Sequence, residues 1–342
     1  MRAFFKKYSG PMYVALITAI MLAILLGSDD LAQIRDTLAA LDARWTMAAA
    51  GCIFLYLFLR VATLKFYLAR RGRRISWLQA AGVTGAGQFY SAITPSASGG
   101  QPMQILWLHR LDIPVSLGTA CTSAKFLGFQ TAMLSLGALA WLLRRDMVAQ
   151  QLHGLRWLVL LGYAVNSALI AAIVLTLPKT RIMDTLIRLI VRLGEKLHLV
   201  KNSDSVQAAF DNAVKDYREA LIQLLRKPAD ALMVFLLSVL QILAYMSVAI
   251  CLHKAFHLTG TDCVQILTLQ LMLFIAAAFI PLPGAAGAQE SGFCLFFRGV
   301  FPESALIPAM IAWRFFSYYL LMFSGLTMMA PARILSKKNA KK

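Results

Sequence analysis

Long apolar blocks are the feature that most constrains how this chain can fold. Three of them are residues 11–27, 157–177 and 229–252, and each contains at most one charged side chain. A helix of about 20 apolar residues crosses the ~30 Å hydrocarbon layer of a bilayer. That layer offers no water to backbone groups, so helices are the default spanning structure. We therefore expect an all-α polytopic membrane protein, with residues 1–342 forming a single transmembrane domain.

The net charge of +18 indicates a membrane surface rather than nucleic acid, and we expect no nucleic-acid partner. Only 15% of the residues are charged, against about 25% in soluble domains, and the cations lie between apolar blocks. Cations in such positions set orientation and contact anionic phospholipid headgroups. The sequence has no C-x-x-C, Walker, G-x-S-x-G or H-E-x-x-H motif. We therefore expect no metal, no cofactor and no enzymatic activity.

The positions of Lys and Arg predict orientation, because cationic loops stay in the cytoplasm. The first residues, the arginine-rich loop 69–76, the stretch 178–228 and the tail carry the cations. Both termini are then cytoplasmic, in a bacterial inner membrane. Residues 143–156 carry three arginines yet fall on the outer side, as the one violation of the rule. The six expected spans, of which the first is uncleaved, are residues 11–27, 45–68, 117–142, 157–177, 229–252 and 303–330.

Two apolar segments remain, and each must begin and end on one side of the membrane. They are residues 77–116 and residues 262–302, and each is interrupted by proline and glycine. Proline lacks a backbone donor and glycine is conformationally permissive, so a regular helix does not pass through such a break. We expect two re-entrant hairpins of opposite orientation. Their break residues are Pro95, Gly99, Gly100, Pro281, Pro283, Gly284 and Gly287.

The two broken segments resemble each other when one is shifted by 188 residues. Seven of 22 aligned positions are identical. The identities are Pro95/Pro283, Ala97/Ala285, Gly99/Gly287, Gln101/Gln289, Arg110/Arg298, Pro114/Pro302 and Ser116/Ser304. We expect span–hairpin–span to occur twice in inverted orientation, over about 45–142 and 229–330, with a cytoplasmic amphipathic connector at about 178–228. Inverted repeats with interrupted helices are typical of transporters whose breaks hold a charged group near mid-membrane.

Few ionisable residues fall inside the spans and hairpins, and burial of such residues is costly. The cations are Arg60, Lys125 and Arg314, and the acid is Glu290. The resulting positive charge would be neutralised by a phosphate group, since arginine binds phosphate well. The alternative is that Arg314 and Glu290 form a structural pair while Arg60 and Lys125 extend toward the membrane surface. We expect a substrate-binding site formed by Arg60, Lys125, Glu290, Arg314, Gln101 and Gln289.

Two motifs carry a resemblance to a known family. Thr94–Gln101 reads T-P-S-A-S-G-G-Q, and residues 281–290 read P-L-P-G-A-A-G-A-Q-E, with Ala312-Trp313-Arg314 following. These segments resemble the lysylphosphatidylglycerol synthase transmembrane (flippase-domain) family, which includes the multiple peptide resistance factors. The resemblance covers nearly the whole chain. It implies a domain that moves aminoacylated phosphatidylglycerol, such as lysyl-phosphatidylglycerol, from the inner to the outer leaflet, with Glu290 and Arg314 as functional candidates.

The sequence departs from the family pattern in two ways. Many members have an acid–Arg pair where this chain has Ala124-Lys125, which leaves the headgroup preference open. Full synthases also carry a soluble aminoacyl-transferase domain, for which this chain has no room. We expect a stand-alone transport domain, with a separate aminoacyl-phosphatidylglycerol synthase as a candidate partner.

Other interpretations stay open at this point. The domain could carry a polyprenyl-phosphate or a glycolipid, or it could be a non-transporting membrane partner of a lipid synthase. An intramembrane headgroup enzyme is disfavoured, because such an enzyme needs a constellation of base and nucleophile, which a lone Glu290 with scattered histidines does not supply. The connector could serve self-association as a homodimer, regulation or surface binding. The sequence does not fix the lipid, the direction or the energy source.

Overall fold

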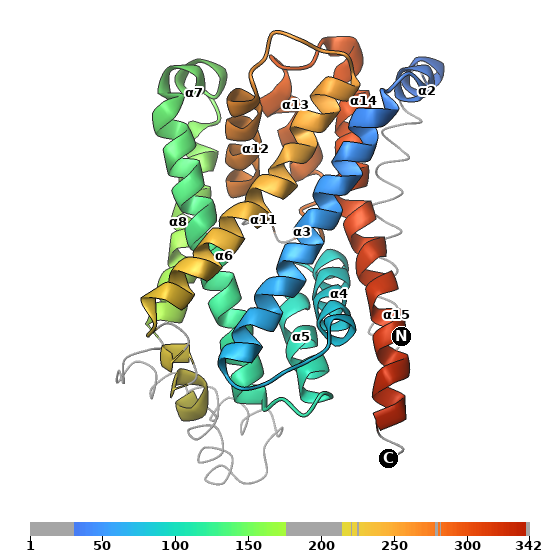
Figure 1. Ribbon diagram of the computed structural model, residues 1–342. Coiled ribbons are helices and arrows are strands. Elements are labelled where there is room, and N and C mark those ends of the chain that lie inside the picture. The colour runs from blue at the N-terminus through green and yellow to red at the C-terminus, as the bar shows by residue number, and fades with distance from the viewer. Residues whose placement is uncertain are drawn as a thin grey trace, which may run out of the picture.

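A computed structural model gives the fold of most of the chain (Figure 1). The first expected span, most of the connector and Pro281 lie outside the described residues. Within the described part, the secondary structure is helical, and no strand occurs beyond one isolated β-bridge. The described residues are 31–175, 214–219, 221–223, 226–277, 280 and 282–339.

Five helical segments within the described residues are long and apolar enough to cross a membrane. They lie within a few residues of five of the expected spans, so the all-α polytopic class is confirmed. The segments are α3 (Ala43–Arg70), α6 (Val115–Leu143), α8 (Arg156–Val174), α11 (Pro228–Ala255) and the combined helix Glu303–Ala330. The last is built from α14 (Glu303–Arg314), the π-helix η1 (Phe315–Leu320) and the start of α15 (Leu321–Asn339).

Shorter helices flank both expected breaks. The first break separates α4 (Trp77–Ile93) from α5 (Gly100–His109), and the second separates α12 (Cys263–Ala277) from α13 (Ala288–Phe297). In Figure 1, α4 and α5 lie in the lower half of the molecule and α12 and α13 in the upper half. The two broken segments therefore occupy opposite ends of the bundle.

Local interactions explain why α4 begins and ends where it does. A capping box starts it: Ser76 Oγ accepts the Gln79 N–H at 3.1 Å, and Gln79 Oε1 accepts the Ser76 N–H at 2.8 Å. The helix ends before Thr94, the residue preceding Pro95, because proline disfavours helical backbone in the residue before it. Thr94 Oγ1 then accepts the N–H of Gly99 at 2.9 Å, which closes the turn of the break.

The two breaks meet inside the molecule. Pro95 and Pro283 form an isolated antiparallel β-bridge, and these prolines are 188 residues apart. The backbone that follows the two prolines keeps the same spacing, because two further pairs share left-handed φ angles. They are Ser96 (51°) with Gly284 (58°), and Ala97 (54°) with Ala285 (48°).

Close helix crossings hold the bundle together. Helix α4 crosses α15 where Gly85 meets Gly325, and a Cβ on Gly85 would lie 2.6 Å from the Gly325 carbonyl oxygen. Small residues allow membrane helices to approach so closely. Helices α3 and α11 pack along each other, with the Tyr56 and Tyr245 rings 5.2 Å apart. These crossings position the side chains of the candidate site.

The loop that violates the charge rule lies at one end of the molecule. Helix α7 (Arg145–Gln151) is at the same end as α2 (Leu31–Ala39), opposite the end of α15 (Figure 1). This arrangement matches the predicted orientation, in which residues 143–156 and the last helix's end lie on opposite sides of the membrane. Arg144 pairs with Asp262 at 2.6 Å, so part of the loop's positive charge is neutralised. The cytoplasmic location of the tail stays a prediction.

Candidate functional site

A cavity of about 430 Å³ lies between the two breaks. Helices α3, α4, α6 and α11 contribute to its wall, together with both breaks and the end of α14. Five of the six residues expected at a substrate site line it. They are Arg60, Gln101, Lys125, Gln289 and Arg314. The sixth, Glu290, contacts the lining residue Arg314.

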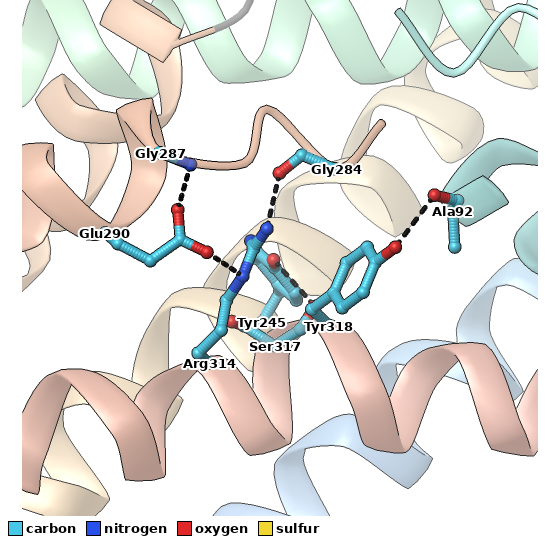
Figure 2. Close-up of polar contacts among 8 residues, drawn as sticks. All are labelled: Ala92, Tyr245, Gly284, Gly287, Glu290, Arg314, Ser317 and Tyr318. Atoms are coloured by element: carbon cyan, nitrogen blue, oxygen red, sulfur yellow. Dashed lines mark hydrogen bonds and ion pairs between the residues drawn. The ribbon is translucent and has the colours of Figure 1, made fainter. Parts of the chain in front are cut away.

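Glu290 and Arg314 form a buried ion pair (Figure 2). Glu290 Oε1 lies 2.7 Å from Arg314 Nε, and the two side chains are only 5% and 4% exposed. The other carboxylate oxygen accepts the backbone N–H of Gly287 at 2.7 Å. Arg314 Nη2 donates to the Gly284 carbonyl at 2.8 Å. Both oxygens of the acid are therefore engaged inside the protein.

Tyr318 supports Arg314 and reaches across to the first half of the chain. The Arg314 guanidinium carbon lies 4.4 Å from the centre of the Tyr318 ring, a cation–π arrangement. The Tyr318 hydroxyl donates to the Ala92 carbonyl at 2.9 Å, at the end of α4. One tyrosine thus links the last span to the start of the first break, as Figure 2 shows.

The π-helix η1 begins immediately after Arg314. Within it, the Ser317 carbonyl accepts a hydrogen bond from the Tyr245 hydroxyl of α11 at 3.2 Å (Figure 2). Short π-helical turns occur frequently at functional sites, because they displace side chains from the regular helical register. Here the wider turn carries Ser317 and Tyr318, which both line the cavity.

Arg60 and Lys125 also face the cavity, but neither is paired with an acid within the described part of the chain. Arg60 Nη1 donates to the Tyr56 hydroxyl at 2.5 Å. Lys125 Nζ is buried and has no hydrogen-bond partner among the described residues. Lys125 therefore does not extend to the surface of this structure. Because Arg314 and Glu290 neutralise each other, two cations without an acid partner remain among the described residues that line the cavity.

The break residues shape the loops that border the cavity. Gly99 and Gly100 start α5, and a Cβ on Gly100 would lie 1.8 Å from Ser91 Oγ of α4. Pro283, Gly284 and Gly287 lie in the turn before α13. Gly284 has a φ of +58°, and a Cβ there would lie 2.3 Å from the Tyr318 ring. Both breaks thus use glycine where another element approaches closely. Pro281 falls outside the described residues.

Sequence reasoning named two of the carboxamides around the cavity, Gln101 and Gln289, and missed the other five. Gln130 Nε2 donates to Asn166 Oδ1 at 2.5 Å, and Gln241 Nε2 donates to Thr63 Oγ1 at 2.9 Å. Each amide is an isolated polar residue inside an apolar span, and that isolation was the available signal. The carboxamides that line the cavity are Gln88, Gln101, Gln104, Gln130, Asn166, Gln241 and Gln289.

The described residues contain no group of three or more His, Cys, Asp or Glu side chains placed to hold a metal ion. The polar chemistry of the cavity is that of guanidinium, ammonium, carboxamide and hydroxyl groups. Such groups bind anions and hydroxyl-bearing molecules.

Comparison with known proteins identifies the family. A UPF0104 membrane protein of Archaeoglobus fulgidus is 23% identical over 283 residues, which cover 78% of this chain and 79% of the relative. The family model described as the lysylphosphatidylglycerol synthase TM region matches residues 12–325. That match covers four of the described spans, most of the fifth, both breaks and the cavity, and the chain belongs to the lysylphosphatidylglycerol synthase TM region family.

Proposed function

We propose that this protein is a flippase-like transporter that moves phospholipids of the phosphatidylglycerol type across the membrane. The observation that carries the proposal is the pair of uncompensated cations, Arg60 and Lys125, at a cavity between two broken helices. A buried ammonium without a partner is costly. A lipid phosphate entering the cavity would compensate it, with the acyl chains remaining in the bilayer.

The internal repeat supports transport over static binding. Helices α5 and α13 are both ten residues long and begin 188 residues apart. The Pro95–Pro283 bridge relates equivalent positions of the two halves. Opposite placement of the broken segments in Figure 1 fits an inverted repeat of two re-entrant hairpins. In transporters of that design, rocking of one repeat against the other exposes a central site to alternate sides.

The family membership suggests the cargo and its direction. By the resemblance of the break motifs, the family's cargo is aminoacylated phosphatidylglycerol, such as lysyl-phosphatidylglycerol, carried from the inner to the outer leaflet of the cell membrane. For this chain we propose the wider class of phosphatidylglycerol-type lipids, carried in the same direction. A separate synthase would supply an aminoacylated member of that class. The lipid phosphate would meet Lys125 and Arg60, while Arg314 and Glu290 hold the second break in place.

A leaflet-translocation assay tests the proposal. Purified protein is reconstituted into liposomes that contain acyl-chain-labelled phosphatidylglycerol, and a membrane-impermeant reductant bleaches the outer-leaflet label. Transport makes the inner-leaflet label accessible over time. We expect the unaltered protein to move the lipid and Lys125→Gln to slow it at least about tenfold, which equals a loss of ~1.4 kcal/mol.

The matched control is Lys254→Gln, which removes an exposed lysine at the end of α11 and outside the cavity lining. It should move lipid like the unaltered protein. The inner-leaflet label of liposomes with the unaltered protein could bleach no faster than that of empty liposomes, under any ion gradient or membrane potential applied. Transport of these lipids is then excluded. The non-transporting partner of a lipid synthase then becomes the better interpretation.

A further inference from the structure

We infer that the cavity selects lipids with a net anionic, hydroxyl-bearing headgroup and discriminates against the lysylated headgroup. This inference rests on the lipid-binding part of the proposed function and specifies its substrate class. It narrows the range of cargo suggested by the family resemblance, and it comes from the charges and polar groups that line the cavity.

In the part of the chain that the structure describes, the charged residues that line the cavity are all cationic. Among the described residues that line the cavity, Arg60, Lys125 and Arg314 are cationic and none is Asp or Glu. The adjacent acid, Glu290, uses one oxygen for Arg314 and the other for the Gly287 N–H. A cationic headgroup would therefore find no unengaged carboxylate in this part of the chain.

The candidate headgroups differ in net charge. Phosphatidylglycerol carries one negative charge on its phosphodiester. Lysyl-phosphatidylglycerol carries the same phosphate and two amines that are largely protonated near neutral pH, so its net charge is about +1. Placing that headgroup beside Arg60 and Lys125 puts like charges together, and like-charge contacts of this kind reject a partner. The phosphatidylglycerol headgroup instead compensates the two cations.

The remainder of a lipid headgroup would meet the carboxamides around the cations. Carboxamides from several elements face the cavity, with Gln101 and Gln289 following the two breaks and Gln130 and Asn166 bonded to each other on α6 and α8. A carboxamide both donates and accepts, which matches a hydroxyl group. The cavity is therefore suited to an anion surrounded by hydroxyls, as in a glycerol or sugar phosphodiester.

Competition among four labelled lipids tests the inference. Phosphatidylglycerol has the anion and the hydroxyls, and phosphatidylmethanol has the anion alone. Lysyl-phosphatidylglycerol reverses the net charge, and phosphatidylcholine is zwitterionic. In the translocation assay we expect phosphatidylglycerol to move fastest and phosphatidylmethanol several-fold slower. The lysylated and choline lipids should move at least about tenfold slower.

A charge-reversing variant makes the test specific to the cavity. Lys125→Glu places a free carboxylate where the unpaired ammonium lies. We expect Lys125→Glu to slow the movement of phosphatidylglycerol and to raise the rate of the lysylated lipid relative to that of phosphatidylglycerol. The rates of both lipids should be unchanged in Lys254→Gln. Folding of each variant is checked by its thermal unfolding in detergent, with and without each lipid, because a bound lipid raises the unfolding temperature.

The outcomes separate the two proposals. If the unaltered protein moves and binds lysyl-phosphatidylglycerol as well as phosphatidylglycerol, the selectivity is wrong and transport stands. If no lipid moves while phosphatidylglycerol alone raises the unfolding temperature, the selectivity stands for binding and transport is wrong. If no lipid moves and none raises the unfolding temperature, both proposals are overturned.

Discussion

Arg314 and Glu290 join the last span to the helix that follows the second break, through an ion pair of 2.7 Å between Nε and Oε1. Arg314 also holds the Gly284 carbonyl, and Glu290 holds the Gly287 N–H. Two side chains thus fix both ends of a four-residue turn that borders the cavity. The pair that the sequence offered as a structural alternative is therefore present. Among the described residues that line the cavity, Arg60 and Lys125 are then the cations that have no acid partner.

Breaking this pair from either side should destabilise the protein. Glu290→Gln leaves a buried guanidinium without its counter-ion, and Arg314→Ala leaves a buried carboxylate. Removing one partner of a buried pair costs about 3–5 kcal/mol, so we expect a clear fall in the thermal unfolding temperature in detergent. Arg314→Lys keeps the charge but cannot contact Glu290 and the Gly284 carbonyl at the same time. Its unfolding temperature should fall less than that of Arg314→Ala.

The control for this prediction is Arg145→Ala, since Arg145 is exposed and lies only 3.7 Å from the exposed Asp146. Exposed pairs of that kind contribute about 0–1 kcal/mol, so the unfolding temperature should hardly change. An unaltered unfolding temperature for both Glu290→Gln and Arg314→Ala would show that the pair does not hold the second break.

Lys125→Met should separate function from stability. Methionine has a similar length and fills the same space, while the variant removes a buried ammonium that has no partner among the described residues. Burying an unpaired charge is unfavourable, so we expect the unfolding temperature to stay the same or rise. Transport of phosphatidylglycerol should nevertheless fall at least about tenfold. A variant that is destabilised yet transports normally would remove Lys125 from the site.

Gly284→Ala should be more damaging than Gly260→Ala. Both glycines have positive φ, +58° and +93°, but a Cβ would meet the Tyr318 ring at 2.3 Å only at Gly284. Left-handed backbone costs a residue with a Cβ roughly 1–2 kcal/mol, and overpacking adds about 1–3 kcal/mol. Unfolding temperatures of the two variants measure the difference. An equal fall in unfolding temperature for the two variants would mean that Gly284 does not closely approach Tyr318.

Apolar length and proline–glycine punctuation were sufficient to predict the described spans and the positions of both breaks. Those features act locally, so they can be read along the chain. The positions of Arg60 and Lys125 at one cavity depend on how α3 and α6 pack, which hydropathy does not encode. Tyr318 was missed for a similar reason, since its register follows from a π-helix. The pairing of Arg144 with Asp262 could not be predicted either, because it joins loops that are 118 residues apart.

The two breaks lie close enough for a covalent crosslink between them. Pro95 and Pro283 form an antiparallel backbone bridge, and residues opposite each other in such pairs have Cα atoms about 4.5–5.5 Å apart. A disulfide accepts about 4.4–6.8 Å. Pro95→Cys with Pro283→Cys, in a protein whose five native cysteines are replaced by serine, should therefore form a disulfide under mild oxidation. Peptide mapping without reduction detects the linked fragments.

Transport by rocking of the two repeats requires the breaks to separate at one stage of the cycle. The oxidised double-cysteine variant should therefore stop moving phosphatidylglycerol, and a thiol reductant should restore it. Pro95→Cys alone cannot form this bridge and controls for the loss of the proline. Full transport by the crosslinked protein would mean that the breaks stay together, and that the lipid headgroup passes them without any relative movement of Pro95 and Pro283.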